Sequence, residues 1–440
     1  MKIVYIATGA ANMYCGSCMR DNTLAAALQS AGHEVTLLPL YTPMRLDEES
    51  VGEQRIFMGG IAAYLLQKYP NRSIWRDWLL KIAGSQTLVR LLPHFDMGSN
   101  VDPAQNGDLA LSMLRGETGH QRDLLEEMLT WLATEQRPDL IYITNTLLSG
   151  LAPALKRRLN LPIFCGLHGE DIFLDGLPTS YQEQALTLIR ENCASIDHFL
   201  SISQYYLDTF LPRLNISPAR ATVVAPGIHL HDFPLTPPRV GKAPFTIGYL
   251  ARLAPEKGLH LLADAFIRLV RGGEFPGLRL RVAGYYSRAY RPYVEGVQKR
   301  LRQAGVSEQV ELVGTVDRAQ KLEFLHSLDV FALPTVYRDP KGLPTFEAWA
   351  SGLPVVLPHH GAFPEWIATS QQGSIRGGLL HTPEDPSDLA EKIAHLLRHP
   401  DQRCAIAEAG QHAVRSYFSS QAMAQRTQQV YQTVLGARPV

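Results

Sequence analysis

The 440-residue chain has few cysteines, no excess of charge of one sign and no long hydrophobic run. Five cysteines, an odd number, are too few for a disulfide-rich secreted scaffold. The 42 Lys and Arg residues equal the 42 Asp and Glu residues in number, which argues against nucleic acid as a partner. No segment approaches the roughly 18 consecutive apolar residues of a membrane-spanning helix, and the apolar run at 3–7 is too short for a signal peptide. We therefore expect a soluble, cytoplasmic protein.

Several catalytic motifs are also missing from the chain. It contains no Gly-x-Gly-x-x-Gly, no Walker A loop, no His-Glu-x-x-His and no Gly-x-Ser-x-Gly. Their absence argues against a dehydrogenase, a nucleoside triphosphatase, a zinc protease and a serine hydrolase.

Apolar runs and helical patterns alternate along the chain. Residues 3–7 indicate a strand, 9–18 a loop of small residues, 21–31 a helix and 34–40 a second strand. A strand, a helix and a strand with short connections form a parallel βαβ unit. Further strands are expected at 139–144, 162–166, 198–202, 245–250, 278–283, 310–313, 330–333 and 354–357. The strand at 354–357 is expected to complete the second sheet. Further helices are expected at 149–159, 259–271, 290–304, 320–327, 345–351, 386–398, 402–417 and 421–435.

These elements predict an α/β protein of two doubly wound, Rossmann-like domains that face each other across a cleft. The first domain is expected at 1–231, a proline-rich linker at 232–244 and the second domain at 245–419, with a helix at 420–440 packing back on the first. In such sheets, ligands bind outside the carboxyl ends of the strands.

The first domain contains a less regular segment at about 50–130. Trp75, Trp78 and several leucines alternate there with Arg and Lys residues. A helical insert that packs on its own domain explains this spacing, because apolar residues at helical intervals are the usual sign of a core. A basic amphipathic helix lying on an anionic membrane has the same composition, so a peripheral contact with a membrane surface stays open.

Two segments of the second domain have the features of an anion site. In the first, a Gly342-Leu343-Pro344 turn precedes a helix that opens near Thr345, and the N–H groups and dipole of a helix start favour phosphate. Glu347 in the first turn can reach a ribose diol. The alternative is a plain strand-to-helix turn in which Glu347 only interacts with the helix dipole.

In the second segment, Arg252 and Lys257 follow a strand and precede a helix, which places two cations at a strand's carboxyl end. Two such cations can hold a diphosphate and stabilise the charge that grows on it as a leaving group. The alternative is a solvated basic loop.

With these segments the sequence resembles the family 4 nucleotide-sugar glycosyltransferases, which have the two-domain GT-B fold. Leu-Ala-Arg-Leu-Ala-Pro-Glu-Lys-Gly at 250–258 is similar to a Gly-Arg-Leu-x-Pro-x-Lys-Gly pattern, and a Glu-x7-Glu pattern ends at Glu347. The resemblance covers nearly the whole chain and is weakest over about 45–135. Further similar segments are Ser201-Ile-Ser203, the loop at 225–233 and residues 348–356.

The resemblance implies a retaining transfer of a sugar from a nucleoside diphosphate donor to an acceptor hydroxyl of a saccharide, a lipid-linked molecule or a small molecule. It implies no cofactor and no bound metal, and the chain lacks the Asp-x-Asp metal pair of the other common glycosyltransferase fold. Arg252 and Lys257 would bind the diphosphate, Glu347 the ribose, and the amides of 342–345 the phosphate or the sugar.

In the first domain, the resemblance places His168 at the family's active-site histidine, near the transferred sugar. Asp171 is expected near the acceptor hydroxyl. Gly16 corresponds to a glycine of the family's first loop, which approaches donor and acceptor. Without the resemblance, His168 is more simply a turn histidine satisfied by backbone hydrogen bonds.

The chain departs from the family pattern at the first glutamate of Glu-x7-Glu. Asp339, one methylene shorter, stands there, and Pro340 replaces the usual glycine. Pro340 removes an N–H group and restricts Asp339 to an extended conformation. In the family this carboxylate contacts hydroxyls of the transferred sugar, so an inactive sugar-nucleotide-binding protein is one alternative and a nucleotide-sugar epimerase of the same fold is another.

Cys15 and Cys18 form a Cys-x-x-Cys at a helix start. A low thiol pKa there would suit redox chemistry, and convergence with Cys165 and His168 would suit zinc. Small half-buried residues that shape the loop are the simpler interpretation. The nucleobase, the sugar, the acceptor and the oligomeric state stay open at this point.

Overall fold

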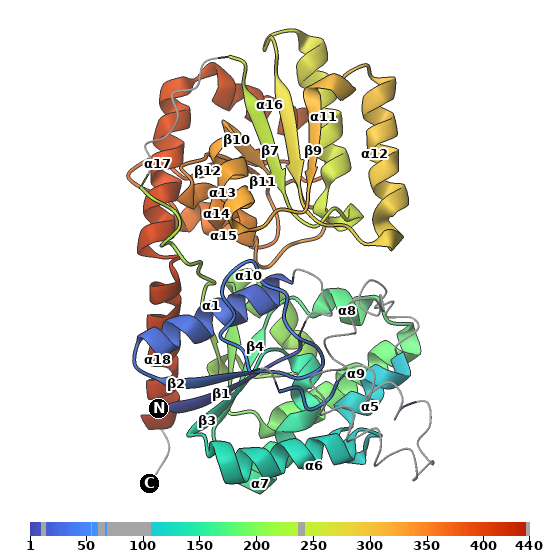
Figure 1. The fold of residues 1–440 in the computed structure, drawn as a ribbon, viewed down its shortest axis with the longest axis vertical. Coiled ribbons are helices and arrows are strands. Elements are labelled where there is room, and N and C mark those ends of the chain that lie inside the picture. The colour runs from blue at the N-terminus through green and yellow to red at the C-terminus, as the bar shows by residue number, and fades with distance from the viewer. Residues whose placement is uncertain (10–14, 54, 60–66, 68–106, 236–242, 437–440) are drawn as a thin grey trace. The chain divides into compact units, whose positions relative to one another are not determined.

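The computed structural model describes residues 1–9, 15–53, 55–59, 67, 107–235 and 243–436. The chain divides into two compact units. Unit 1 comprises Met1–Ala225 and Met423–Val440, and unit 2 comprises Pro226–Ala422. Each unit is built around one parallel sheet that helices flank (Figure 1).

The described strands of unit 1 are β1 (Lys2–Ala7), β2 (Glu34–Pro39), β3 (Leu140–Ile143), β4 (Ile163–Leu167), β5 (His198–Ser201) and β6 (Ala221–Val223). All of them are parallel, in the order β2-β1-β3-β4-β5-β6. The strands at the centre are apolar and buried, as expected for a parallel sheet with both faces covered. The order reverses between β1 and β3, which is the switch point where a doubly wound sheet binds ligands.

Helices cover both faces of this sheet. On one face, α1 (Gly16–Ser30) and α18 (Ser420–Gly436) enclose an apolar core, in which the ring of Tyr431 lies 4.6 Å from that of Phe164 on β4. A second core contains residues of the remaining helices. These are α5 (Gly107–Leu114), α6 (Arg122–Trp131), α7 (Ala152–Leu159), α8 (Asp171–Asp175), α9 (Thr179–Asn192) and α10 (Gln204–Phe210).

The described strands of unit 2 are β7 (Thr246–Leu250), β8 (Arg279–Ala283), β9 (Val310–Gly314), β10 (Val330–Ala332), β11 (Val355–Pro358) and β12 (Gly378–His381). They are parallel in the order β12-β11-β10-β7-β8-β9. This is the strand order of the dinucleotide-binding fold, and its switch point lies between β7 and β10.

The helices of unit 2 begin where the local sequence favours a helix start. Asp317 and Gln320 form a capping box, and the Asp385 side chain accepts the amides of Ser387 and Asp388. The helices are α11 (Leu259–Gly272), α12 (Arg291–Gln303), α13 (Arg318–His326), α14 (Leu343–Ala350), α15 (Phe363–Thr369), α16 (Pro386–Arg398) and α17 (Pro400–Ser416).

The predicted fold class, two doubly wound α/β domains, is confirmed. Three details were wrong. Residues 16–18 are the first turn of α1 and not part of a loop, and residues 146–151 form a 3-10 helix ahead of α7. The strand at 354–357 does not complete the second sheet, because β12 pairs beside β11 through Val355 and Gly378. A four-residue strand has too short a hydrophobic pattern to be separated from a turn.

The chain first passes from unit 1 to unit 2 between Ala225 and Pro226. Residues 226–231 belong to unit 2, where Ile228 forms a parallel bridge with Ser419. Residues 236–242 of the proline-rich segment lie outside the described residues.

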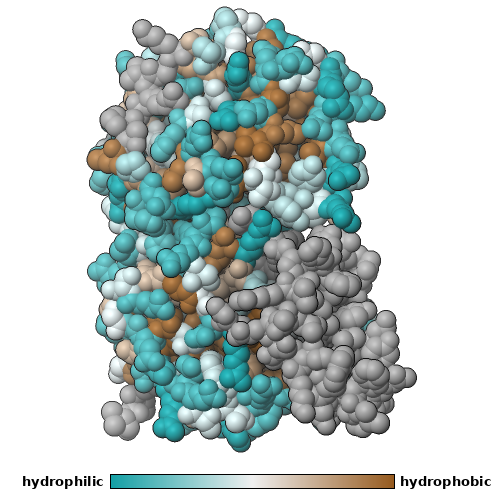
Figure 2. All heavy atoms as spheres, in the orientation of Figure 1, coloured by the Kyte–Doolittle hydropathy of each residue, from teal (hydrophilic) through white to brown (hydrophobic). Residues whose placement is uncertain are grey.

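Within the predicted insert at 50–130, α5 and α6 are described, whereas Trp75, Trp78 and the basic residues around them lie outside the described residues. No helix in the described part of the chain is long and apolar enough to cross a membrane. Hydrophilic side chains cover much of the visible face, with hydrophobic residues in scattered groups (Figure 2).

Candidate functional site

The loops that follow β7 and β10 contact each other through hydrogen bonds and a close backbone approach at the switch point of unit 2. Gly258 has φ +74°, and a Cβ there would lie 1.7 Å from the Pro334 carbonyl oxygen. The Glu256 carbonyl oxygen accepts the amides of Val336 at 3.0 Å and Tyr337 at 3.1 Å. Glycine at 258 therefore permits a close approach that any side chain would block.

Lys257 and Asp339 form an ion pair between these two loops. Lys257 Nζ lies 2.5 Å from Asp339 Oδ2, with 20% and 6% of the two side chains exposed. Asp339 Oδ1 accepts the amides of Lys341 at 2.9 Å and Gly342 at 3.2 Å. Burial alone would raise the pKa of Asp339, but attraction to Lys257 and the hydrogen bonds from Lys257 and the Lys341 amide lower it to about 2. The carboxylate is therefore charged at neutral pH and holds the loop before α14.

Arg252 lies in the same loop as Lys257 and is more exposed. Its Nη2 is 2.5 Å from Glu256 Oε1, and 37% of its side chain is exposed. The guanidinium lies 5.8 Å from the centre of the Tyr290 ring, in the loop after β8. One carboxylate on a half-exposed guanidinium leaves donors that can bind an anion.

The turn before α14 has the geometry expected from its glycine and proline. Gly342 has φ +61°, and a Cβ there would lie 2.5 Å from the Phe363 ring. Leu343 and Pro344 begin the helix, and the buried Thr345 donates its amide to the Gly342 carbonyl at 2.8 Å. Pro344 has no amide hydrogen, so three amides and not four are present at 342–345.

Glu347 is buried one turn further along α14. Its Oε1 forms an ion pair with Nζ of Lys321 on α13, a lysine that is also buried. Lys321 was missed by sequence analysis, because a lysine in an amphipathic helix is usually a surface residue. The pair fixes the orientation of the Glu347 carboxylate.

In unit 1, the loop after β4 places His168 beside the switch point. His168 is 2% exposed, and its Nε2 lies so close to Gly166 that a Cβ there would be 2.3 Å away. Its Nε2 is 3.4 Å from the Tyr142 hydroxyl, and its Nδ1 is 3.9 Å from Asp21 Oδ1. Asp21 and Tyr142 were missed by sequence analysis.

Glu170 holds this loop together. It is buried, and its carboxylate accepts the His168 amide at 2.7 Å, the Thr146 hydroxyl at 2.9 Å and the Tyr206 hydroxyl at 3.2 Å. Burial raises the pKa of Glu170, while the hydrogen bonds from His168 and Thr146 oppose the shift. Asp171, at the start of α8, donates its amide to the Tyr206 hydroxyl at 3.2 Å.

Gly16 is the first residue of α1, directly after Cys15 at the N-cap. Arg20 and Asp21 follow one turn later and are both buried. Of the three residues predicted for unit 1, His168 and Asp171 both lie in the segment that follows β4. Gly16 lies at the start of α1, the helix that also carries Asp21.

Among the described residues, Cys15, Cys18, Cys165 and His168 are not arranged as the zinc site considered as an alternative. Cys18 and Cys165 are buried, and burial raises the pKa of the Cys165 thiol well above its ordinary value. A redox-active thiol needs the opposite shift. Among the described residues, which include Cys15 and His168, no group of three or more His, Cys, Asp or Glu residues is arranged to hold a metal.

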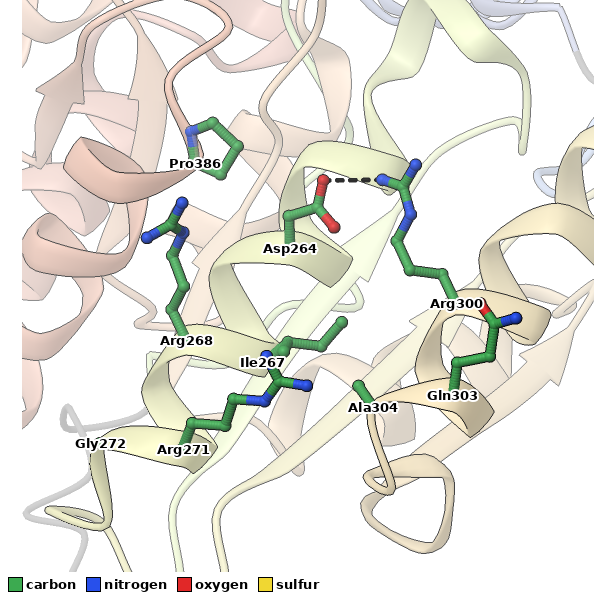
Figure 3. Close-up of a pocket in the computed structure, with 9 residues that line it drawn as sticks. All are labelled: Asp264, Ile267, Arg268, Arg271, Gly272, Arg300, Gln303, Ala304 and Pro386. Atoms are coloured by element: carbon green, nitrogen blue, oxygen red, sulfur yellow. Dashed lines mark hydrogen bonds and ion pairs between the residues drawn. The ribbon is translucent and has the colours of Figure 1, made fainter.

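A pocket on the helical surface of unit 2 contains none of the predicted site residues. Figure 3 shows Arg268 and Arg271 on α11 and Arg300 on α12, with Arg300 Nη1 2.7 Å from Asp264 Oδ2. It is a separate feature from the loops at the strand ends.

Two family models match the chain. Residues 237–413 match "Glycosyl transferases group 1", and residues 22–227 match "Glycosyl transferase 4-like domain". Together these two matches span most of both units.

Curated relatives are similar over much of the chain. Glycogen synthase from Mycobacterium tuberculosis (strain ATCC 25618 / H37Rv) is 28% identical over 309 residues, 67% of this chain and 69% of that protein. A GDP-mannose-dependent monoacylated alpha-(1-6)-phosphatidylinositol monomannoside mannosyltransferase from Corynebacterium glutamicum is 25% identical over 287 residues, 62% of this chain and 70% of that protein.

Solved structures share the fold. Anabaena HepE in complex with UDP aligns with a TM-score of 0.68 at 16% identity, over 98% of this chain and 100% of that chain. Sucrose-phosphate synthase from Thermosynechococcus elongatus aligns with a TM-score of 0.70 at 18% identity, over 99% of each chain.

Proposed function

The chain belongs to the family 4-like glycosyltransferases of the GT-B fold, and from this membership we propose that it transfers a sugar from a nucleoside diphosphate donor to an acceptor hydroxyl with retention of anomeric configuration. The observation that carries this proposal is the Lys257–Asp339 ion pair of 2.5 Å, which joins the loops at the carboxyl ends of β7 and β10. Phosphate ligands bind at this place in doubly wound sheets.

In the proposed donor complex, Arg252 and Lys257 bind the diphosphate. The bond between the anomeric carbon and the β-phosphate oxygen breaks, and its electron pair stays on that oxygen. Two cations beside the start of α14 stabilise the charge that develops there. The acceptor oxygen forms its bond on the same face of the sugar, and its proton passes to a phosphate oxygen.

The remaining predicted residues bind the rest of the donor. Glu347 accepts hydrogen bonds from the ribose hydroxyls, with its carboxylate held by Lys321. Gly342 and Thr345 already donate their amides within the turn, so the Leu343 amide is the donor that we assign to the phosphate or the sugar. When the diphosphate is bound, Lys257 contacts both the diphosphate and Asp339. The Asp339 carboxylate then also accepts hydrogen bonds from hydroxyls of the transferred sugar.

In unit 1, His168 is proposed to lie near the transferred sugar and Asp171 near the acceptor hydroxyl. Gly16 is proposed to keep the start of α1 free of a side chain, so that donor and acceptor can approach the backbone. No bound metal or other cofactor is part of this proposal, because Arg252 and Lys257 supply the positive charge that a metal supplies elsewhere.

The nucleobase is the first property to measure. Names of similar proteins differ on this point, since HepE was solved with UDP and the mannosyltransferase uses GDP-mannose. We would record thermal unfolding with UDP, GDP, ADP and dTDP for wild type, Lys257→Gln and Lys299→Gln. Lys299 is an exposed lysine on α12 and serves as the control for loss of one charge.

A nucleotide at one hundred times its dissociation constant stabilises the folded state by about 2.7 kcal/mol, a shift of a few degrees for a chain of this size. We expect one nucleotide to raise the melting temperature of wild type and Lys299→Gln, and Lys257→Gln to lose that shift. The same shift in all three proteins would exclude Lys257 from the donor site.

Retention is tested separately by proton NMR of the product. A donor of known anomeric configuration should give a glycoside of the same configuration, and the inverted anomer would overturn the mechanism. Incubating the donor without acceptor tests the epimerase alternative, which the transferase relatives do not favour. A new epimer in that sample would revive it, and binding without any transfer would favour the inactive alternative.

A further inference from the structure

A buried polar cluster next to His168 has no role in the mechanism above. It consists of Tyr5 on β1, Arg20 and Asp21 on α1, and Tyr142 on β3, and each of them is at most 1% exposed. Buried charges are rare unless they are paired, and this cluster lies at the switch point of the unit 1 sheet.

Arg20 joins two stacked tyrosines. The rings of Tyr5 and Tyr142 are 4.2 Å apart, and Nη1 of Arg20 donates to the Tyr5 hydroxyl at 2.7 Å and to the Tyr142 hydroxyl at 3.3 Å. Nε and Nη2 of Arg20 are buried and have no hydrogen-bond partner in the described part of the structure. The hydrogen bonds of Arg20 in this cluster are therefore made by Nη1, which also lies 3.3 Å from Asp21 Oδ1.

The hydroxyl groups of the two tyrosines contact different groups on their other side. The Tyr5 hydroxyl donates to Asp21 Oδ1 at 3.0 Å, and Asp21 Oδ2 accepts the Thr144 hydroxyl. The Tyr142 hydroxyl lies 3.4 Å from Nε2 of His168. Because the oxygen of Tyr142 accepts from Arg20, its hydrogen is available for His168.

The imidazole of His168 thus faces the cluster with both nitrogens. Nδ1 lies 3.9 Å from Asp21 Oδ1, within ion-pair reach but longer than a hydrogen bond, and Nε2 faces Tyr142. Contacts of this length in a protein without substrate often shorten in the reactive complex. A carboxylate on one side of an imidazole and a hydroxyl on the other select one tautomer.

We propose that Asp21 and Tyr142 are positioning residues for His168, with the imidazole proton kept on Nδ1 toward Asp21 and Nε2 accepting the Tyr142 hydroxyl. Arg20 holds the Asp21 carboxylate and the two tyrosines in place. The consequence for transfer rests on the proposed function, because it requires His168 to serve the reaction. The tautomer itself does not depend on any activity.

The two tyrosines provide a matched pair of variants. Tyr142→Phe and Tyr5→Phe each remove one buried hydroxyl that accepts from Arg20 Nη1, but the Tyr142 hydroxyl is the one that faces His168. We expect Tyr142→Phe to lower kcat about 10- to 100-fold with the donor KM nearly unchanged, as misplacement of a reacting group does. Tyr5→Phe should keep most of the wild-type kcat, although its melting temperature should fall by about as much as that of Tyr142→Phe.

Asp21→Asn tests the other nitrogen of His168. It keeps the shape of the side chain and should also lower kcat, with a changed pH profile because the imidazole loses its charged neighbour. In a His168→Ala background, Tyr142→Phe and Asp21→Asn should have little further effect, since residues that act through one group are not additive. Equal losses of kcat in Tyr5→Phe and Tyr142→Phe, or full additivity with His168→Ala, would overturn the proposal.

Nitrogen NMR of the imidazole in the free protein gives a readout that needs no substrate, with the His168 signal assigned by its loss in His168→Gln. We expect a protonated Nδ1 and a bare Nε2 in wild type and Tyr5→Phe, a shifted Nε2 signal in Tyr142→Phe and a changed tautomer ratio in Asp21→Asn. A proton on Nε2 in wild type would contradict the proposal. If wild type transfers no sugar, the proposed function fails, while this measurement still decides the positioning role.

Discussion

Lys257 Nζ lies 2.5 Å from Asp339 Oδ2, although the two residues are 82 positions apart in the chain. The contact joins the loop after β7 to the loop before α14, and the Lys341 and Gly342 amides bind the other carboxylate oxygen. Both oxygens of the Asp339 carboxylate therefore have partners within the protein. A diphosphate at Lys257 would compete with this carboxylate, so the affinity for donor depends on how the lysine is shared.

The low pKa of Asp339 predicts a dependence of stability on pH. Its folded pKa of about 2 lies below the ordinary value of 3.8, so the ionised form stabilises the folded state. This contribution, about 2 kcal/mol, is present above pH 4 and is lost as the pH falls toward 2. Urea unfolding of wild type and Asp339→Asn should show wild type to be more stable at pH 7, with a smaller difference at pH 3. A difference that does not change with pH would contradict the assignment.

Arg252 gives a prediction for the rate of transfer. If it stabilises the leaving diphosphate, Arg252→Met should lower kcat about 100- to 1000-fold, as the loss of one charge-stabilising donor does. Its side chain is 37% exposed, so we expect little loss of stability. Arg302→Met, at an exposed position of α12, is the control for charge and should transfer normally. Steady-state kinetics of both variants would decide, and a normal kcat for Arg252→Met would remove it from the mechanism.

Much of the fold was predictable because the strands of a parallel sheet are continuous apolar runs. β1, β4 and β7 were each predicted within about one or two residues of their observed bounds. β12 was missed because its four residues follow a glycine-rich segment and pair with β11 alone. The start of α1 was missed because glycine and serine at its first positions indicate a loop.

The candidate site was predictable where a motif is local in sequence. Arg252 and Lys257 lie within one short loop, and Glu347 lies within one helical turn of the Gly342 turn. Tyr5, Asp21 and Tyr142 were not predictable in this way, because they come together from two strands and a helix. A tyrosine inside an apolar strand is normally a core residue, and nothing local shows that its hydroxyl faces a histidine.

The buried pair of Lys321 and Glu347 predicts opposite results for single and double variants. Lys321→Met leaves the Glu347 carboxylate buried without its cation and should cost about 3–5 kcal/mol. Lys321→Met with Glu347→Leu removes both charges and should regain most of the loss in urea unfolding. The double variant should still fail to bind nucleotide in the thermal assay. Nucleotide binding at wild-type affinity by the double variant would show that Glu347 does not hold the ribose.

Two glycines separate backbone strain from a steric clash at the proposed donor site. Gly258 and Gly273 flank α11 with φ +74° and +69°, but a Cβ at 258 would lie 1.7 Å from the Pro334 oxygen, whereas a Cβ at 273 meets nothing within 4 Å. Both Gly→Ala variants should lose about 1 kcal/mol or more from the left-handed backbone conformation.

The clash should make Gly258→Ala different in one further respect. To relieve it, the loop carrying Lys257 must move away from β10, which breaks the contact between Lys257 and Asp339 and displaces the cation from the diphosphate. We expect Gly258→Ala to bind nucleotide at least about tenfold more weakly. This is the loss of affinity that follows when one charge-assisted hydrogen bond of about 1.4 kcal/mol or more is removed. Gly273→Ala should bind as wild type does in isothermal titration. Equal affinities in the two variants would mean that the approach of these loops does not build the donor site.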